Sequence, residues 1–240
     1  MGERPRLTFL VDVDNTLVDN DAAKREMDRV LNEMLTEQGA AQFWRLYEDV
    51  RRDTGMVDIP KTLVRFEQTA SLDRAQRFAL ADFLMGFPYD RYLFPDALAT
   101  LAHLGEMGRV AILSDGDPAY QTSKIWRAGL DEAVGGYVLV YPHKEDHLQE
   151  VTAAFPADHY ILIDDKPAVI TNVTARLTAP LTTVFIRQGK YSHTVPPGPW
   201  SGATLTIDHI GELLAVDAGA FLHTKGGGRQ RDESVSVLPQ

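Results

Sequence analysis

The sequence predicts an α/β fold built on a parallel sheet, with a helical segment inserted after the first strand. Through the second half of the chain, short apolar runs that favour strands alternate with helix-like segments. Such alternation is typical of a parallel sheet with right-handed crossovers. Between the first strand and Pro95, in contrast, the apolar residues recur only at helical spacing.

The expected strands are short and rich in β-branched residues. The first covers residues 7–13, and its almost continuous apolar run indicates a strand buried on both faces. Four more are expected at residues 109–114, 137–141, 159–163 and 181–186. These runs predict a five-stranded core.

Proline marks the starts of three expected helices. Pro95 and Pro167 suit first helical positions, and Asp117 is an N-cap ahead of Pro118. Gly129 stands where the helix after Pro118 should end. These helices are expected to connect the strands.

The inserted segment is expected to form four helices. Gly39 separates the first two, residues 55–60 separate the second from the third, and Ser71 precedes the fourth. We therefore predict a core domain of residues 1–17 and 92–222 and a helical domain of residues 18–91. Residues 223–240 contain three consecutive glycines and few large apolar groups, which predicts a flexible tail.

Composition excludes several function classes. The net charge of the 240 residues is −10, so the chain lacks the basic footprint of a nucleic-acid binder. An acidic protein also repels phosphorylated ligands, and a phosphate site would need local positive charge and a metal cation. There is no cysteine, which excludes disulfides and thiolate chemistry and fits a cytoplasmic location. No apolar run reaches membrane-spanning length and the N-terminus has no signal-peptide pattern, so no membrane association is expected.

Two pairs of acids follow expected strands. Asp12 and Asp14 stand two residues apart at the end of the first strand, a spacing that puts both side chains on one side. Alone, this pattern is more typical of an ordinary turn with N-capping acids. Asp164 and Asp165 follow the strand at 159–163, and paired carboxylates there favour a bound cation, with Mg²⁺ the natural candidate.

Two further strand ends carry groups that suit an anion. Ser114, followed by Asp115 in an exposed turn, could donate hydrogen bonds to a phosphate oxygen. Lys144 follows the strand at 137–141 and adds positive charge at the start of the next helix. Because the carboxyl ends of parallel strands meet at one edge, we expect the four sets of residues to lie together.

In this order, these residues resemble the four motifs of the haloacid dehalogenase-like (HAD) hydrolases. The first is Asp12-Val13-Asp14-Asn15-Thr16, and Ser114, Lys144 and Asp164-Asp165 are similar to the other three. The resemblance implies a Rossmann-like core, and the helical insertion is similar to the C1-type cap of that family. Asn15 replaces the usual glycine, and no third acid follows Asp165.

The resemblance also implies roles for the site residues. Asp12 would be the nucleophile, and Asp14 the acid and then the base, its pKa raised by neighbouring carboxylates against the opposing effect of the metal and Lys144. Thr16, Ser114, Asp115 and Lys144 would bind the phosphoryl group. Asp12, the backbone carbonyl of Asp14, Asp164 and Asp165 would hold Mg²⁺. Since the dehalogenase branch lacks an acid at the position of Asp14, this residue favours phosphate esters over carbon–halogen bonds.

The sequence therefore predicts a Mg²⁺-dependent phosphatase that hydrolyses a small phosphorylated metabolite. A phosphotransferase or phosphomutase with the same nucleophile is the first alternative, and a non-catalytic binding protein on the same scaffold is the second. Trp44, Tyr47 and Phe66 could stack on an aromatic substrate, although a helix-bundle core is the commoner use of such residues. Substrate identity and oligomeric state cannot be read from the sequence.

Overall fold

The computed structural model describes residues 6–222, which are organised around one six-stranded sheet in the order β3-β2-β1-β4-β5-β6. Every strand pair is parallel. The strands cover Leu7–Val11 (β1), Arg109–Asp115 (β2), Val138–Tyr141 (β3), His159–Asp164 (β4), Leu181–Ile186 (β5) and Leu205–Ile207 (β6). The predicted parallel α/β sheet is confirmed, with β6 as a strand that was not expected.

The chain leaves β1 in one direction for β2 and β3, then returns to the other side of β1 for β4. This reversal is a topological switch point, where the loops after neighbouring strands separate and leave a crevice at the carboxyl edge. The predicted acids at the ends of β1 and β4 therefore lie beside such a crevice.

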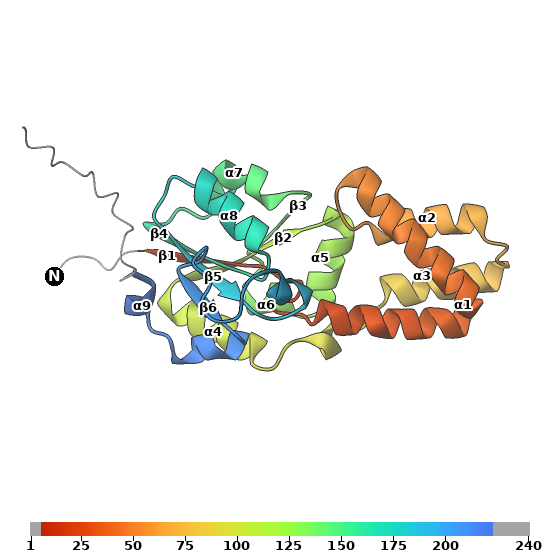
Figure 1. Ribbon diagram of the computed structural model, residues 1–240, viewed down its shortest axis with the longest axis horizontal. Coiled ribbons are helices and arrows are strands. Elements are labelled where there is room, and N and C mark those ends of the chain that lie inside the picture. Colours follow the sequence, from red (N-terminus) through yellow and green to blue (C-terminus); the bar gives the residue numbers. More distant parts are fainter. Residues whose placement is uncertain (1–5, 223–240) are drawn as a thin grey trace, which may run out of the picture.

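Helices cover both faces of the sheet (Figure 1). One face is covered by Ala97–Met107 (α4), Pro118–Arg127 (α5), Leu130–Ala133 (α6) and Ala218–Leu222 (α9), and the other by Leu148–Ala154 (α7) and Pro167–Arg176 (α8). In β1, Phe9 and Val11 pack against the first layer and Leu10 against the second. Burial on both faces explains the continuous apolar runs of the strands.

Between β1 and α4 the chain forms a helical lobe, which consists of Asn20–Thr54 (α1), Ile59–Thr69 (α2) and Arg74–Met85 (α3). Figure 1 shows the three helices together at one end of the molecule. Phe43, Phe66, Leu80 and Leu84 form part of a separate hydrophobic core inside the lobe. The lobe falls within the predicted helical domain of residues 18–91, and its independence as a domain stays a prediction.

Two helix boundaries differ from the predictions. The first two expected helices join directly in α1, and the bend lies at Thr36, whose φ is 75°, whereas Gly39 continues the helix. Helix α4 begins at Ala97 rather than Pro95, because Asp96 before it adopts a left-handed φ of 64° that aspartate tolerates.

Four short 3-10 helices complete the connections: Tyr89–Tyr92 (η1), Lys144–Asp146 (η2), Lys190–Thr194 (η3) and Ile210–Ala215 (η4). Among residues 6–222, no helix combines the length and apolar character needed to cross a bilayer. The predicted tail, residues 223–240, lies outside the described residues.

Candidate active site

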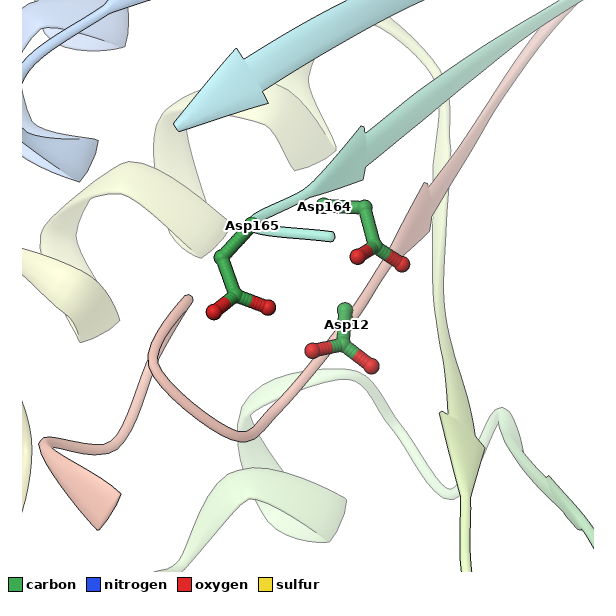
Figure 2. Close-up of side chains that lie close together, drawn as sticks. All are labelled: Asp12, Asp164 and Asp165. Carbon is green, nitrogen blue, oxygen red and sulfur yellow. The ribbon is translucent and has the colours of Figure 1, made fainter. Parts of the chain in front are cut away.

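Three buried aspartates meet at the carboxyl edge of the two central strands. Asp12 follows β1, Asp164 ends β4 and Asp165 comes next, and all three residues are 0 % exposed. Each offers a carboxylate oxygen, and these oxygens all lie within 4.8 Å of one another. Figure 2 shows the three carboxylates gathered at one place beyond the strand ends. The structure thus brings both predicted acid pairs together through Asp12, Asp164 and Asp165.

Lys144 closes one side of this aspartate triad. It lies in η2, and its ammonium is 2.6 Å from Asp12 Oδ1 and 2.6 Å from Asp164 Oδ2, with no exposed surface. It also donates a hydrogen bond to the Leu113 carbonyl at 3.1 Å. Three carboxylates and one ammonium leave a formal charge of −2, which one divalent cation would neutralise.

The free oxygens of the triad fit such a cation. Among the described residues, Asp12 Oδ2 and both carboxylate oxygens of Asp165 are buried without a hydrogen-bond partner. Buried polar atoms are rarely left unpaired, and carboxylate oxygens are the ligands that Mg²⁺ takes. The donor set therefore fits a hard divalent ion held by Asp12, Asp164 and Asp165.

Burial and mutual repulsion raise the pKa values of two aspartates of the triad, Asp12 and Asp165. Burial raises the pKa of Asp12 to about 6, with Lys144 opposing and Asp164 adding to the shift. Burial also raises the pKa of Asp165 to about 9, reinforced by the charges of Asp12 and Asp164. Without a cation, the protonated form of Asp165 is thus favoured at neutral pH.

Asp115 lies beside Lys144, and its carboxylate already accepts hydrogen bonds from two lysines. Its carboxylate accepts hydrogen bonds from the Lys144 backbone N–H at 2.9 Å and from the Lys166 ammonium at 3.2 Å. Burial would raise the pKa of Asp115, but Lys144 and Lys166 outweigh it and hold the pKa below its usual value. Its predicted role in substrate binding stays a prediction, while its observed one is to orient two lysines.

Lys166 is a site residue that the sequence interpretation missed. Only its neighbour Pro167 stands out in the sequence, as the start of a helix. The position of Lys166 directly after the second acid pair was the available signal. Burial would lower its pKa, but the surrounding carboxylates, Asp12 first, raise that pKa well above its usual value, so Lys166 is a fixed cation.

Ser114 and Thr16 are both buried near the strand ends. Ser114 is 1 % exposed, and its hydroxyl accepts a hydrogen bond from Gln121 Nε2 at 2.9 Å. Thr16 is fully buried, and its hydroxyl has no hydrogen-bond partner among the described residues. Their contact with a phosphoryl group stays a prediction.

The Asp14 carboxylate is paired with a lysine that the sequence did not indicate. Its carboxylate oxygens accept hydrogen bonds from the Lys124 ammonium at 2.8 and 3.1 Å, and its side chain is not part of the aspartate triad. Burial would raise its pKa, but Lys124, then Lys166 and Lys24, lower it below the usual value. The expectation that neighbouring carboxylates raise this pKa was wrong, because a lysine from α5 lies closer.

The loop that carries Asp12 and Asp14 is fixed by Asn15, against whose side chain Gly189 packs. Asn15 has a φ of 61°, a left-handed conformation that asparagine tolerates in place of glycine. Its side-chain oxygen accepts a hydrogen bond from the Asp21 backbone at 3.2 Å, at the start of α1. The loop is therefore tied to the helical lobe directly beside the nucleophile candidate.

A cleft of about 240 Å³ opens between the helical lobe and the core. Asp14, Asp115 and Lys166 from the core and Lys24 and Arg51 from α1 line it. The aromatic candidates Trp44, Tyr47 and Phe66 do not line this cleft but pack with Phe43 in the lobe. Phe66 is thus a core residue of the lobe, whereas Trp44 and Tyr47 also line a small cavity beside Asp14, so their contact with a substrate stays a prediction.

Known structures share this fold. No family model and no curated protein matches the sequence. A crystal structure described as a haloacid dehalogenase-like hydrolase from Burkholderia xenovorans LB400 is 36% identical over 90% of this chain and 100% of its own, with a TM-score of 0.79. An L-2-haloacid dehalogenase from Xanthobacter autotrophicus, with chloropropionic acid covalently bound, is 16% identical over 87% of this chain and 96% of its own, with a TM-score of 0.56. The HAD-type protein YfnB from Bacillus subtilis, bound to magnesium, is 17% identical over 88% and 98%, with a TM-score of 0.57.

Proposed function

The chain belongs to the haloacid dehalogenase-like hydrolases, and we propose that it is a Mg²⁺-dependent phosphatase that hydrolyses a small phosphate monoester through an aspartyl-phosphate on Asp12. The aspartate triad with Lys144 is the observation that carries the proposal. Its uncompensated charge and unpaired oxygens call for a divalent ion, and a phosphoryl group is the substrate whose negative charge such a site would stabilise. The magnesium in YfnB supports the choice of ion.

In the first step, an Asp12 oxygen attacks phosphorus and the bond from phosphorus to the ester oxygen breaks. The leaving oxygen takes a proton from the carboxyl group of Asp14. Mg²⁺ held by the triad supplies positive charge that offsets the negative charge of the nucleophile and the phosphoryl group. Lys144, fixed by Asp12 and Asp164, adds a permanent cation at the same point.

In the second step, Asp14 accepts a proton from a water molecule whose oxygen attacks phosphorus. The bond from phosphorus to Asp12 breaks, and inorganic phosphate leaves with Asp12 restored. The observed Lys124–Asp14 pair suits this step, because it holds Asp14 as a carboxylate ready to accept the proton. For the first step, entry of the phosphate ester has to weaken that pair so that Asp14 carries a proton.

The carboxyl group of Asp14 favours phosphate over halide chemistry. The dehalogenase neighbours are below 20% identical, so they establish the fold alone. A carboxyl group at Asp14 serves a leaving oxygen that needs a proton, whereas a halide needs none. A lack of cysteine fits the cytoplasm, where small phosphorylated metabolites occur.

Product analysis tests the proposal. The purified protein, incubated with a panel of phosphorylated metabolites and Mg²⁺, should release inorganic phosphate, and chelation by EDTA should stop the release. The Asp12→Asn variant should lose activity by at least a thousandfold. Chloride release from 2-chloropropionate without phosphate release from any ester would overturn the proposal, as would full phosphatase activity of Asp12→Asn. A rearranged phosphate ester without free phosphate would instead identify a mutase.

A further inference from the structure

The cleft beside Asp14 gathers cations on a protein whose net charge is −10. Its charged lining consists of Lys24, Arg51, Lys166 and Lys190 against Asp14, Asp115 and Glu145. Such a concentration of positive charge on an acidic chain needs a physical reason, since the protein's overall field repels anions.

The carboxylates of the cleft are already engaged with other groups. Asp14 is bonded to Lys124, and Asp115 to Lys166. Glu145 accepts a hydrogen bond from the Asn172 side-chain amide at 3.1 Å. None of these acids therefore neutralises the remaining cations at close range.

Lys24, Arg51 and Lys190 are the remaining cations. Within residues 6–222, neither Lys24 nor Lys190 has an ion pair; the Lys24 ammonium instead donates to the Tyr47 hydroxyl at 2.6 Å, and that of Lys190 lies 5.2 Å from the Tyr191 ring. Arg51 lies 3.6 Å from Glu48 and also interacts with the Tyr191 hydroxyl, and its side chain is 40% exposed. Each of these three side chains therefore keeps N–H donors that could bind a ligand.

Lys24 and Arg51 also repel each other. Burial lowers the pKa of Lys24, and the nearby charge of Arg51 lowers it further against the attraction of Asp14. Both side chains line the same cleft, and an anion bound between them would reduce that repulsion.

These cations line the part of the cleft that would receive the leaving group of the substrate. Asp14 lines the same cleft and, in the proposed function, protonates the leaving oxygen. The part of the substrate beyond that oxygen therefore extends from Asp14 into the cleft, past Lys24. The cleft volume of about 240 Å³ restricts that part to a small molecule.

We propose that Lys24, Arg51 and Lys190 bind a second anionic group, so that the substrate is a small phosphate ester whose alcohol part carries a carboxylate or a second phosphate. This inference rests on the proposed function, because it assigns the leaving-group side of the cleft from the role of Asp14. It adds a substrate class and three specificity-determining residues to that function.

Three esters with a two-carbon alcohol part test it: ethyl phosphate, phosphoglycolate and ethanediol bisphosphate. With Mg²⁺, the wild-type enzyme should show a kcat/KM for one of the charged esters at least tenfold above that for ethyl phosphate. The preferred charged ester identifies the second group as carboxylate or phosphate. Equal kcat/KM values for all three esters would overturn the inference while leaving the phosphatase proposal intact.

Substitutions in α1 test whether Lys24 and Arg51 cause the preference for the charged ester. Lys24→Met and Arg51→Met should each reduce the preference for the charged ester at least fivefold, and Lys24→Arg should restore most of it. Arg52→Met is the matched control, because Arg52 is 73% exposed, pairs with Asp49 at 3.0 Å and does not line the cleft. A variant that merely disturbs the fold lowers kcat/KM for all three esters together, so an unchanged ratio in Lys24→Met and Arg51→Met overturns the inference.

Binding provides a second measurement that does not need turnover. By calorimetry with the Asp12→Asn variant and Mg²⁺, the charged ester should bind at least tenfold more tightly than ethyl phosphate, and adding Lys24→Met should remove the difference. If no ester is hydrolysed by the wild type, the proposed function fails, and this comparison still decides the anion site. Equal affinities for the three esters would overturn it.

Discussion

The ammonium of Lys124 bonds both oxygens of the Asp14 carboxylate, at 2.8 and 3.1 Å, and also reaches the Asn20 side-chain oxygen at 3.4 Å. Only 3% of the Lys124 side chain and 22% of the Asp14 side chain are exposed. The pair therefore connects α5 to the loop after β1 inside the protein. It sets the charge state of Asp14 before any substrate arrives.

Replacing Lys124 by methionine should destabilise the protein by about 1–3 kcal/mol, because it leaves the largely buried Asp14 carboxylate without its partner. The folded-state pKa of Asp14 is lowered, so the pair stabilises the fold above the unfolded pKa of about 3.9 and loses that effect as the pH falls through the folded pKa. Urea unfolding should show a large difference from wild type at pH 7 that shrinks below about pH 4.

A double-mutant cycle measures the coupling energy between Asp14 and Lys124 separately from the other effects of each substitution on stability. Asp14→Asn combined with Lys124→Met should cost clearly less than the sum of the single changes, because neither partner then remains as an isolated buried charge. Strict additivity of the two single changes would show that the observed hydrogen bonds do not couple the residues energetically.

Mg²⁺ should stabilise the protein more at high pH than at low pH. The pKa values of Asp12, about 6, and Asp165, about 9, are raised in the fold, so the metal-free protein binds more protons folded than unfolded and loses stability as the pH rises from about 4 to 9. Metal binding requires the deprotonated carboxylates. Thermal melts with EDTA or Mg²⁺ at pH 5.5, 7 and 8.5 should show a metal-induced shift that increases at each step, and a shift that decreases with pH would contradict the triad as the metal site.

Asp165→Asn should stabilise the metal-free protein while it weakens metal binding. Both oxygens of Asp165 are buried without a hydrogen-bond partner in the described part of the chain. Folding without metal therefore requires either a proton on Asp165 or a charge beside Asp12 and Asp164, and asparagine avoids both costs. We expect a gain of about 1 kcal/mol, or roughly 2–4 °C in Tm, in EDTA. By calorimetry, Mg²⁺ affinity should fall by about tenfold or more.

The control for that variant is Asp49→Asn, on the lobe surface, where the side chain is 46% exposed and pairs with Arg52. It should change stability by less than about 0.5 kcal/mol and leave Mg²⁺ affinity unchanged. Loss of stability in metal-free Asp165→Asn would show that the carboxylate has a structural partner.

Gly189→Ala should disturb the nucleophile loop. Gly189 has a φ of +69°, and an added Cβ would lie 2.4 Å from Asn15 Cγ, next to Asp14. Gly135, with a φ of +63° and no atom within 4 Å of an added Cβ, is the matched control. Gly135→Ala should cost about 1 kcal/mol from backbone strain alone, and Gly189→Ala about 2–4 kcal/mol with the overpacking added. Chemical denaturation measures both, and equal losses would show that the Asn15 contact is easily relieved.

The fold and the aspartate triad were predictable because both depend on local patterns. The apolar runs identified β1 to β5, and the acids at their ends were expected to meet because parallel strands end at one edge. β6 was missed because Leu205–Ile207 is a three-residue strand whose side chains are only half-buried, so its apolar signal is weak.

The surroundings of Asp14 could not be predicted in the same way. Lys124 lies on α5, 110 residues further along the chain than Asp14, and a lysine in a helix usually faces solvent. Nothing in its local sequence shows that it turns inward. The direction of the Asp14 pKa shift depends on that one contact, so the sequence-based expectation had the wrong sign. Lys24 and Arg51 likewise acquire a shared position only through the bend in α1.

That bend has a consequence for how this protein can vary in length. At Thr36 helix α1 doubles back, and the contacts of Lys24 with Tyr47 and of Asp28 with Trp44 hold its two arms side by side. One arm starts at the cleft with Lys24 and the other returns to it with Arg51. A single residue inserted between Thr36 and Arg51 would rotate Arg51 by about 100° around its axis and out of the cleft. Because seven residues, about two helical turns, also add about 10 Å of length, insertions and deletions should be tolerated in steps of about seven residues that are matched in both arms.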